Sequence, residues 1–392
     1  MFLRFLCNFL KIKIFYKKPS KYNIVIFDEV GSYYIKLLLK KKNFFIINSR
    51  LENNFKLNLF IVFNFFFLKN IFKYKLKINY YLSLINIIKP KIILTFIDNS
   101  DEFFELAKLL HKKIFFLAIQ NATRLMDKNN KLTVTSKVFR TINIKKAFIP
   151  NYACFSKNDI CNLKKKISVF NYYDVGSLKF ALFKKYFRKK KSIKYDICLI
   201  SEDFTGYDDL LNSEGIIKKS NFKIAYEKIL RHVCKLSKEE KLKVVIISKH
   251  EESSKLFMQE SQLYEKFINC NHNIKFVPNN IKNFSNYNKI FESKLLIGGN
   301  STLLYEFLNY KRILACNFLL KKNWLSFSYK KKICYLEDSS YKAFKKKVIQ
   351  TLNMSHKNYF KNLGKKKSRY FFMSPASKTL SYIENIINDH AY

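Results

Sequence analysis

Short, continuous apolar runs alternate with amphipathic stretches along most of the chain. Tyr22–Phe27, Lys91–Ile97 and Tyr195–Ile200 are such runs, and Asp101–Lys112 has the apolar spacing of a helix. Strands that are apolar at every position are typical of parallel sheets whose two faces are both covered by helices. The alternation therefore predicts an α/β fold made of doubly wound, Rossmann-like sheets.

The alternation occurs twice, and a basic stretch separates the two parts. We expect an N-terminal α/β domain over residues 21–183, a basic linker at 184–194 and a second α/β domain over 195–340. Residues 1–20 form an apolar and basic N-terminal segment, and residues 341–392 a helical tail. The basic stretch fits either an exposed linker or a phosphate-binding tract. Ligands bind beyond the carboxyl ends of open α/β sheets, so we expect the two domains to face one another across a cleft.

The chain carries a large excess of positive charge. Lys and Arg number 74 against 29 Asp and Glu, which gives +45, but only eight of the 74 are Arg. Surfaces that bind phosphate usually use Arg for its bidentate geometry. The abundance of Lys, Asn, Ile, Phe and Tyr is typical of A/T-rich codons, so we interpret most of the charge as compositional drift. The alternative is attraction to anionic ligands, anionic lipid or nucleic acid.

The sequence predicts a folded cytoplasmic protein. Hydrophobic residues make up 48 %, which excludes an intrinsically disordered chain. The eight cysteines show no CxxC spacing, so we expect buried thiols in a reducing compartment. The longest uncharged apolar run, Leu57–Leu68, is shorter than the roughly 20 residues that cross a bilayer. Segment 1–20 is either a packed first helix or a frayed terminus, or it lies on the anionic inner face of the plasma membrane.

Polar residues follow three successive strands of the first half. Those suited to hydrogen-bonding a polyhydroxylated ligand include Asp28, Asn99, Gln120, Asn121 and Arg124. Asp98 lies at the tip of Lys91–Ile97, where partial desolvation could bring the pKa of a carboxylate toward neutrality, and it is the candidate general base. The alternative is that Asp98 or Ser100 caps the helix that begins at Asp101.

The clearest element of the second half is a strand, a Gly-Gly turn and a helix within Leu295–Phe307 (LLIGGNSTLLYEF). Glycines let a backbone approach an anion, while hydroxyls and N–H groups at the start of a helix point toward it. The residues that would hold a phosphate are Gly298, Gly299, Asn300, Ser301 and Thr302. A plain structural turn shows the same pattern. Glu306 either reaches a sugar hydroxyl or is a solvated surface side chain.

A further pair of candidate residues follows the strand Val244–Ile247. Lys249 and His250 could neutralise a departing diphosphate in place of a metal, although a lone histidine is more often structural. The sequence has no HExxH motif, no Cys/His zinc spacing and no clustered DxD motif, so we predict no metal site. The strand Tyr195–Ile200 is followed by Ser201, Glu202 and Asp203.

Four short segments stand in a specific order along the chain. They are Pro90–Ser100 (PKIILTFIDNS), Phe116–Arg124 (FLAIQNATR), Val175–Lys179 (VGSLK) and Gly298–Arg312 (GGNSTLLYEFLNYKR). In order and spacing these segments are similar to those of bacterial surface-carbohydrate biosynthesis proteins of the glycosyltransferase type. The resemblance spans Tyr22–Phe318, and the shared order of the motifs is its specific part.

The resemblance implies a GT-B-like enzyme that has an acceptor domain first and a nucleotide-sugar domain second, and that needs neither a metal nor a cofactor. By position, Ser301, Thr302 and Glu306 would hold the nucleotide and phosphates of the donor. The residues that would face the acceptor are Asp98, Asn99, Gln120 and Asn121. The chain departs from the family pattern at Ala122, where glycine is usual, and at Gly298–Asn300, which replace an acidic residue.

Together, the residues and the resemblance suggest a cytosolic glycosyltransferase of surface polysaccharide biosynthesis. Its partners would be a nucleotide-sugar donor and a glycan or lipid-linked acceptor, with peripheral contact to an anionic membrane as a further possibility. One alternative is a nucleic-acid-binding protein that uses the lysine excess, although the scarcity of Arg argues against it. Another is a transferase of a different activated group, such as glycerol phosphate or pyruvate, on the same scaffold.

Overall fold

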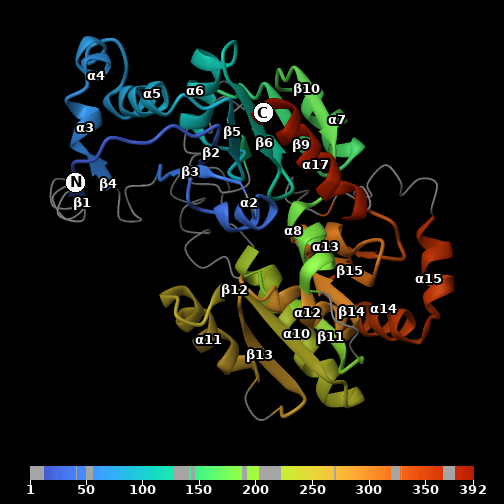
Figure 1. Cartoon of the computed structure of the whole chain (residues 1–392). Coiled ribbons are helices and arrows are strands. Elements are labelled where there is room, and N and C mark those ends of the chain that lie inside the picture. The colour runs from blue at the N-terminus through green and yellow to red at the C-terminus, as the bar shows by residue number, and fades with distance from the viewer. Residues whose placement is uncertain are drawn as a thin grey trace. The chain divides into compact units, whose positions relative to one another are not determined.

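The computed structural model divides the chain into two compact units. The residues that it describes are 13–40, 42–49, 56–126, 141–142, 146–187, 192–202, 222–268, 271–318, 327, 329–364 and 376–392. Unit 1 comprises Met1–Leu182 and Ser374–Tyr392, and unit 2 comprises Phe183–Met373. Figure 1 labels most of the helices and strands of both units.

In the part of the chain that the structure describes, unit 1 contains a six-stranded parallel sheet and its helices. The strands are β2 (Ile24–Phe27), β3 (Phe44–Ile47), β5 (Ile92–Thr95), β6 (Phe115–Ile119), β9 (Asn151–Cys154) and β10 (Asn171–Asp174). They lie in the order β10-β9-β6-β5-β2-β3, and Ile24 of β2 is paired with Ile92 on one side and Phe44 on the other. The helices include α2 (Ser32–Leu38), α5 (Leu76–Ile88), α6 (Asp101–Leu110), α7 (Lys157–Lys164), α8 (Leu178–Leu182) and α17 (Ala376–Ala391).

Several smaller elements complete unit 1. A first strand pair, parallel like the main sheet, leads into two short helices. These elements are β1 (Lys13–Phe15), β4 (Lys56–Asn58), α3 (Leu59–Val62) and α4 (Phe65–Lys69). A second parallel pair joins β7 (Leu125–Met126) to β8 (Thr141–Ile142).

The core of unit 1 follows from its apolar pattern. Every side chain of β2 and β5 is fully buried, as expected for strands that are apolar at each position. Helix α5 has no charged residue after Lys77, and most of its thirteen residues are buried. Helix α6 has a single apolar stripe instead, and it begins at Asp101 because the Ser100 hydroxyl accepts a hydrogen bond from the Phe103 N–H.

Unit 2 contains a second six-stranded parallel sheet within the residues described. Its strands are β11 (Tyr195–Ile200), β12 (Val244–Glu251), β13 (Ile274–Asn279), β14 (Ser293–Gly298), β15 (Arg312–Cys316) and β16 (Tyr335–Leu336). They lie in the order β13-β12-β11-β14-β15-β16, which is the strand order of a dinucleotide-binding Rossmann sheet. The helical elements include η2 (Phe183–Phe187), α10 (Phe222–Glu240), α11 (Lys255–Ile268), α12 (Ser285–Phe291), α13 (Thr302–Phe307), α14 (Tyr341–Asn353) and α15 (His356–Leu363).

The two parallel sheets confirm the predicted α/β class with two Rossmann-like domains. The predicted tail, residues 341–392, is helical where it is described, but its helices are divided between the units. Helices α14 and α15 belong to unit 2, whereas α17 belongs to unit 1 and contacts α8 and β5 (Figure 1). The sequence could not show this division, because an amphipathic pattern reveals that a face is buried but not which sheet covers it.

The start of the predicted basic linker is packed within unit 2. The rings of Phe183 and Phe187 in η2 lie 6.0 and 4.7 Å from the ring of Phe284. Residues 188–191 of the linker, like residues 1–12 of the N-terminal segment, lie outside the described residues. None of the helices that the structure describes is long and apolar enough to cross a membrane. The described free thiols include the buried Cys154 and Cys198, and burial raises the pKa of both.

Candidate functional site

Each sheet has one place where the strand order reverses, and ligands of open α/β sheets bind beyond the strand ends at such a switch point. In unit 2 the reversal lies between β11 and β14, and in unit 1 it lies between β2 and β5. The predicted phosphate-binding turn follows β14, and Asp98 follows β5. Both predicted sites are therefore at a switch point of their own sheet.

The switch point of unit 2 is occupied by a side chain of the protein itself. Glu202, which follows β11, accepts hydrogen bonds from the N–H groups of Gly299 at 3.0 Å and Asn300 at 2.9 Å. A Cβ atom added at Gly299 would lie 2.7 Å from Oε2 of Glu202, so the absence of a side chain there makes this contact possible. The Gly-Gly turn does bind an anion, as its pattern predicts, but the anion in this structure is the Glu202 carboxylate.

The helix that follows the turn begins at Thr302, as the sequence predicts, but Glu306 is not on its solvated surface. Helix α13 has only six residues, and the Ser301 hydroxyl caps it by accepting from the Leu303 N–H at 3.3 Å. Glu306 is not a solvated surface residue, because it is 3 % exposed and its carboxylate accepts a hydrogen bond from the Tyr287 hydroxyl at 2.8 Å. Of the predicted hydroxyl donors, Thr302 is half-buried in the first turn of the helix.

Lys249 and His250 lie at the same end of the sheet, on the strand next to β11. Strand β12 pairs with β11 as far as Ile247, and its register against β13 then shifts before Glu251. Lys249 is exposed and His250 is half-buried. Two hydrogen bonds fix this backbone, from the His250 N–H to Ser248 Oγ at 2.9 Å and from Asn279 Nδ2 to the Lys249 carbonyl at 3.3 Å. The structure therefore places two cationic or titratable side chains beside the switch point.

A buried polar network under this end of the sheet was not predicted. Glu260 of α11 is fully buried and accepts hydrogen bonds from the hydroxyls of Ser201, which follows β11, and Ser248, which lies within β12. The Tyr264 hydroxyl donates to Ser201 Oγ at 2.6 Å. The only sequence signal for Glu260 is an acidic residue among the apolar positions of an amphipathic helix, and that signal does not identify its partners.

The role of Glu202 gives a stability prediction. We expect Glu202→Gln to lower the free energy of unfolding of unit 2 by about 1.5–3 kcal/mol, because hydrogen bonds to a charged group are lost and an amide N–H can face the N–H groups of the turn. Chemical denaturation followed by circular dichroism measures this. The exposed Glu252→Gln is the matched control, and equal stability of the two variants would show that Glu202 does not hold the turn.

The cluster at the switch point of unit 1 is a buried ion pair. Asp98 is fully buried, and its carboxylate accepts from Nε of Arg124 at 2.7 Å and from a second guanidinium nitrogen of Arg124. The Tyr152 hydroxyl of β9 also donates to Asp98. The Arg124 side chain is 1 % exposed. Bidentate pairing of this kind holds both side chains in one geometry.

These contacts do not suit the predicted role of Asp98 as a general base. Burial alone would lower the pKa of Arg124, but the Asp98 carboxylate offsets this and raises it, so the guanidinium stays charged. Burial, and then the charge of Asp98, raises the pKa of Tyr152 well above its ordinary value, so its hydroxyl remains a donor. The carboxylate oxygens of Asp98 are thus engaged by fixed donors, and Ser100 rather than Asp98 caps α6.

Three of the four motif segments meet at Asn121. Its side-chain amide donates to the Phe96 carbonyl at 2.6 Å, and its side-chain oxygen accepts from Arg124 at 2.6 Å. Nζ of Lys179 lies 3.4 Å from the Asn121 carbonyl and 5.3 Å from the centre of the Tyr34 ring. The motifs therefore build one connected structure around the ends of β5 and β6.

The other predicted acceptor residues are separate from this cluster. Gln120 is fully buried, and its side chain accepts from the Phe155 N–H at 2.8 Å and donates to Asp159, whose pKa burial raises. Asp28 accepts from the Val30 N–H at 2.9 Å and from the Ser49 hydroxyl at 2.8 Å. Gln120 thus links the ends of β6 and β9, and Asp28 links the ends of β2 and β3. Asn99 is half-buried in the turn between β5 and α6.

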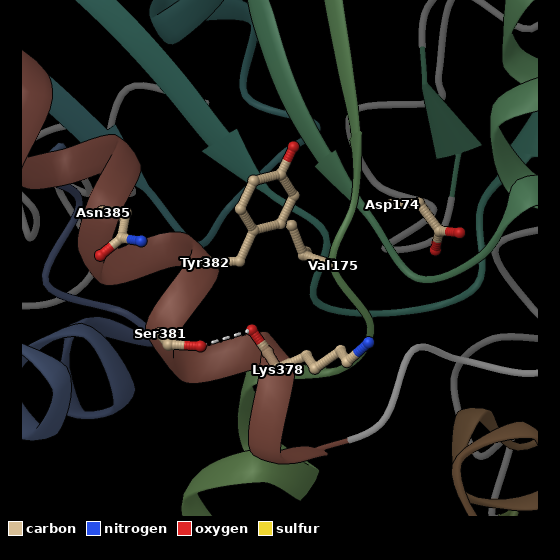
Figure 2. A pocket seen from close by; sticks show the side chains of 6 residues that line it. All are labelled: Asp174, Val175, Lys378, Ser381, Tyr382 and Asn385. Carbon is tan, nitrogen blue, oxygen red and sulfur yellow. Dashed lines mark hydrogen bonds between the residues drawn. The ribbon is translucent and has the colours of Figure 1, made fainter.

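A pocket of about 370 Å³ lies in unit 1 between the chain that follows β10 and helix α17 (Figure 2). Its lining consists of Asp174, Val175, Lys378, Ser381, Tyr382 and Asn385. Tyr382 reaches from α17 toward Val175, is 44 % exposed and contacts the edge of the Tyr173 ring. The pocket combines an aromatic face, a carboxylate, an amide and an ammonium group at the carboxyl end of a parallel strand. No local motif predicts it, because its two sides are distant in the sequence.

Within the described residues, no group of three or more His, Cys, Asp or Glu side chains is placed to hold a metal ion. This observation does not test whether the reaction needs a metal, so the expected metal independence stays a prediction.

No protein-family model matches this sequence, and the comparison with curated proteins finds no match. Solved structures do match over nearly the whole chain. The UDP-GlcNAc 2-epimerase from Neisseria meningitidis, bound to UDP-GlcNAc, matches 95 % of this chain and 99 % of its own, with a TM-score of 0.53 and 12 % identity. The UDP-GlcNAc 2-epimerase from Methanocaldococcus jannaschii, in complex with UDP-GlcNAc and UDP, matches 96 % and 100 %, with a TM-score of 0.52 and 12 % identity.

A third similar structure is the wall teichoic acid polymerase TagF soaked with CDPG. It matches 94 % of this chain and 89 % of its own, with a TM-score of 0.52 and 10 % identity. Identities this low show a shared fold and carry no residue roles. The chain therefore has a GT-B-type fold, which consists of two Rossmann-like domains and C-terminal helices.

Proposed function

We propose that this chain is a glycosyltransferase that moves a sugar from a nucleotide-sugar donor to a glycan or lipid-linked acceptor of a surface polysaccharide. The observation that carries the proposal is the polar strand ends of unit 2, where Lys249, His250 and the Gly-Gly turn lie around the switch point of a Rossmann-ordered sheet. The fold is shared with proteins that bind UDP-GlcNAc and CDPG, which supports a nucleotide-linked donor.

In this proposal the phosphates of the donor bind the cationic side chains of unit 2. The N–H groups of Gly299 and Asn300 already donate to Glu202, so the Gly-Gly turn acts as a rigid wall of the site and not as its phosphate ligand. Lys249 and His250 neutralise the charge that develops on the departing nucleotide. Thr302 supplies a further hydroxyl near the same strand end.

The acceptor binds the pocket of unit 1 in the same proposal. A sugar ring would lie on the exposed face of Tyr382, while Asp174 and Asn385 hydrogen-bond its hydroxyls. Asp174 is half-buried in this pocket and replaces Asp98 as the carboxylate that faces an acceptor hydroxyl. Lys378 would bind an acidic substituent of the acceptor.

Transfer of another activated group on the same scaffold is the second candidate. It is favoured by the match to TagF soaked with CDPG, whose TM-score of 0.52 is close to that of the epimerases. The two candidates share the nucleotide-binding side chains of unit 2, so the identity of the transferred group decides between them.

A nucleotide-release assay tests the proposal. The full chain is incubated with UDP-, CMP-, GDP- and CDP-linked sugars and with CDP-glycerol, each with and without bacterial lipid-linked glycans. We expect acceptor-dependent release from a sugar nucleotide, and release from CDP-glycerol alone would favour the second candidate. No release from any donor contradicts the proposal.

The same assay tests the acceptor pocket. We expect Tyr382→Ala to raise the KM for the acceptor about tenfold and to leave the donor KM unchanged, whereas the exposed Tyr392→Ala changes neither.

A further inference from the structure

Unit 1 carries a cluster of outward-facing apolar side chains that the nucleotide and acceptor sites do not use. It runs from the end of α3 through α4 and the following turn to the start of α5, and we call it the apolar ridge. Its members and their exposed fractions are Phe63 at 66 %, Phe65 at 76 %, Leu68 at 50 %, Phe72 at 101 % and Leu76 at 64 %. Single exposed apolar residues are common on protein surfaces, but five large ones within one short segment are not.

The exposure of the ridge is not the result of a loose segment. Ile61 of α3 and Phe67 of α4 are 1 % and 3 % exposed and belong to the core of unit 1. Both helices also begin at capped positions, because the side chains of Asn58 and Asn64 accept hydrogen bonds from the Phe60 and Phe66 N–H groups. The segment is therefore anchored to the core of unit 1 while its other large apolar side chains remain exposed.

The neighbouring strand β1 extends the exposed apolar surface. Ile14, Phe15 and Tyr16 are 59 %, 42 % and 69 % exposed. The Tyr16 ring lies in edge contact with Phe60 of α3, with 5.7 Å between ring centres. The residue that follows β1 therefore packs against α3.

The charged side chains of the ridge segment itself, residues 63–76, are all lysines. The sequence has no Asp or Glu from residue 53 to residue 97. Lys69, Lys73 and Lys75 are exposed between or beside the ridge residues. The acidic side chains that approach this segment come from α6, where Glu105 lies 3.9 Å from Lys75 and Glu102 lies 2.5 Å from the half-buried Lys77. Exposed lysines thus lie between and beside the exposed apolar side chains.

We propose that the apolar ridge inserts into the interface of a membrane that contains anionic lipid. Aromatic and aliphatic side chains gain by entering the boundary between head groups and acyl chains, and adjacent lysines gain from the negative surface potential of anionic lipid. If the ridges of two copies of this chain docked on one another, their like-charged lysines would be brought together. We therefore propose a lipid surface as the partner, and not a second copy of this chain. The proposal does not depend on glycosyl transfer.

Co-sedimentation with vesicles tests the ridge. One set of vesicles contains phosphatidylcholine alone, and the other contains seven parts phosphatidylcholine to three parts phosphatidylglycerol. We expect the full chain to prefer the anionic vesicles. Phe65→Ser/Leu68→Ser/Phe72→Ser reduces partitioning on the order of 100-fold, and it abolishes the part of the binding that persists at high salt. Lys69→Gln/Lys73→Gln/Lys75→Gln reduces partitioning by roughly fivefold per lysine at low salt.

Matched controls separate the ridge from the general charge of the chain. Ile224→Ser/Leu256→Ser/Met258→Ser removes apolar residues of unit 2 that are 61 %, 51 % and 59 % exposed. Lys342→Gln/Lys346→Gln/Lys357→Gln removes three exposed lysines of unit 2. We expect both controls to bind vesicles like the unmodified chain.

Two results would overturn the proposal. The first is equal vesicle binding by the ridge variant and its apolar control, with both folded by circular dichroism. The second is a sizing experiment in which the ridge variant turns a self-associated chain into a monomer while vesicle binding is unchanged, since the ridge would then join two copies.

Discussion

Replacing Arg124 with methionine is expected to lower the free energy of unfolding of unit 1 by about 3–5 kcal/mol. The substitution leaves the fully buried Asp98 carboxylate without its cation, and an unpaired charge in a protein interior carries its full desolvation cost. Chemical denaturation followed by circular dichroism, or hydrogen exchange of the β5 and β6 amides, measures the loss. The exposed Arg231→Met in unit 2 is the control, and we expect it to cost less than about 1 kcal/mol.

A second substitution shows whether the loss comes from the ion pair. Asp98→Asn combined with Arg124→Met removes both charges, so we expect the double variant to regain part of the stability that Arg124→Met loses. Asp98→Asn alone should destabilise unit 1, because it leaves the Arg124 guanidinium unpaired. A variant Asp98→Asn that is as stable as the unmodified chain but inactive in transfer would contradict the structural role, and would restore Asp98 as the general base.

The largest effect on chemistry is expected from Lys249 and His250. We expect Lys249→Ala/His250→Ala to lower kcat for nucleotide release by roughly 100- to 1000-fold, because removing groups that stabilise the charge developing on a leaving group costs rate on that scale. The same variant should keep its unfolding transition, since Lys249 is exposed and His250 is half-buried. The kinetic constants for the donor, measured at saturating acceptor, give the result.

Another Lys and His pair in unit 2 provides the control. Lys266 and His272 are both exposed, and we expect Lys266→Ala/His272→Ala to release nucleotide at the unmodified rate. Equal rates in the two double variants would remove Lys249 and His250 from the donor site, even if transfer itself were confirmed.

Much of the fold could be predicted because its strands are apolar at every position. Lys91–Ile97 predicts β5 to within a few residues, and the same holds for the central strands of unit 2. The apolar pattern does not predict helices α7 and α12. Helix α7 buries only Leu163, so its apolar period is weak, and α12 is too short at seven residues to show a period.

The strand-end positions of the candidate residues were predictable, but their contacts were not. The Gly-Gly turn before α13 predicts N–H groups that bind a phosphate at a strand end, and in the structure these N–H groups donate to a carboxylate. The anion is Glu202, which lies 97 residues earlier than Gly299, and no local pattern reveals a partner at that distance. Asp98 and Arg124 likewise lie 26 residues apart, and their pairing depends on the register of β5 and β6. Spacing predicts which groups reach a strand end, while tertiary contacts decide which of them bind one another.

The most direct test of the central claim is whether unit 2 binds a nucleotide sugar. Thermal unfolding of the full chain is followed with each of the UDP-, CMP-, GDP- and CDP-linked sugars, and with generic RNA. At 100 times its Kd, a true donor stabilises the folded state by about 2.7 kcal/mol, which is a rise in Tm of roughly 5–10 °C for a unit of this size. We predict such a rise with one nucleotide class, and its loss in Lys249→Ala/His250→Ala. A transition that RNA shifts and that none of the nucleotide sugars shifts would contradict the claim.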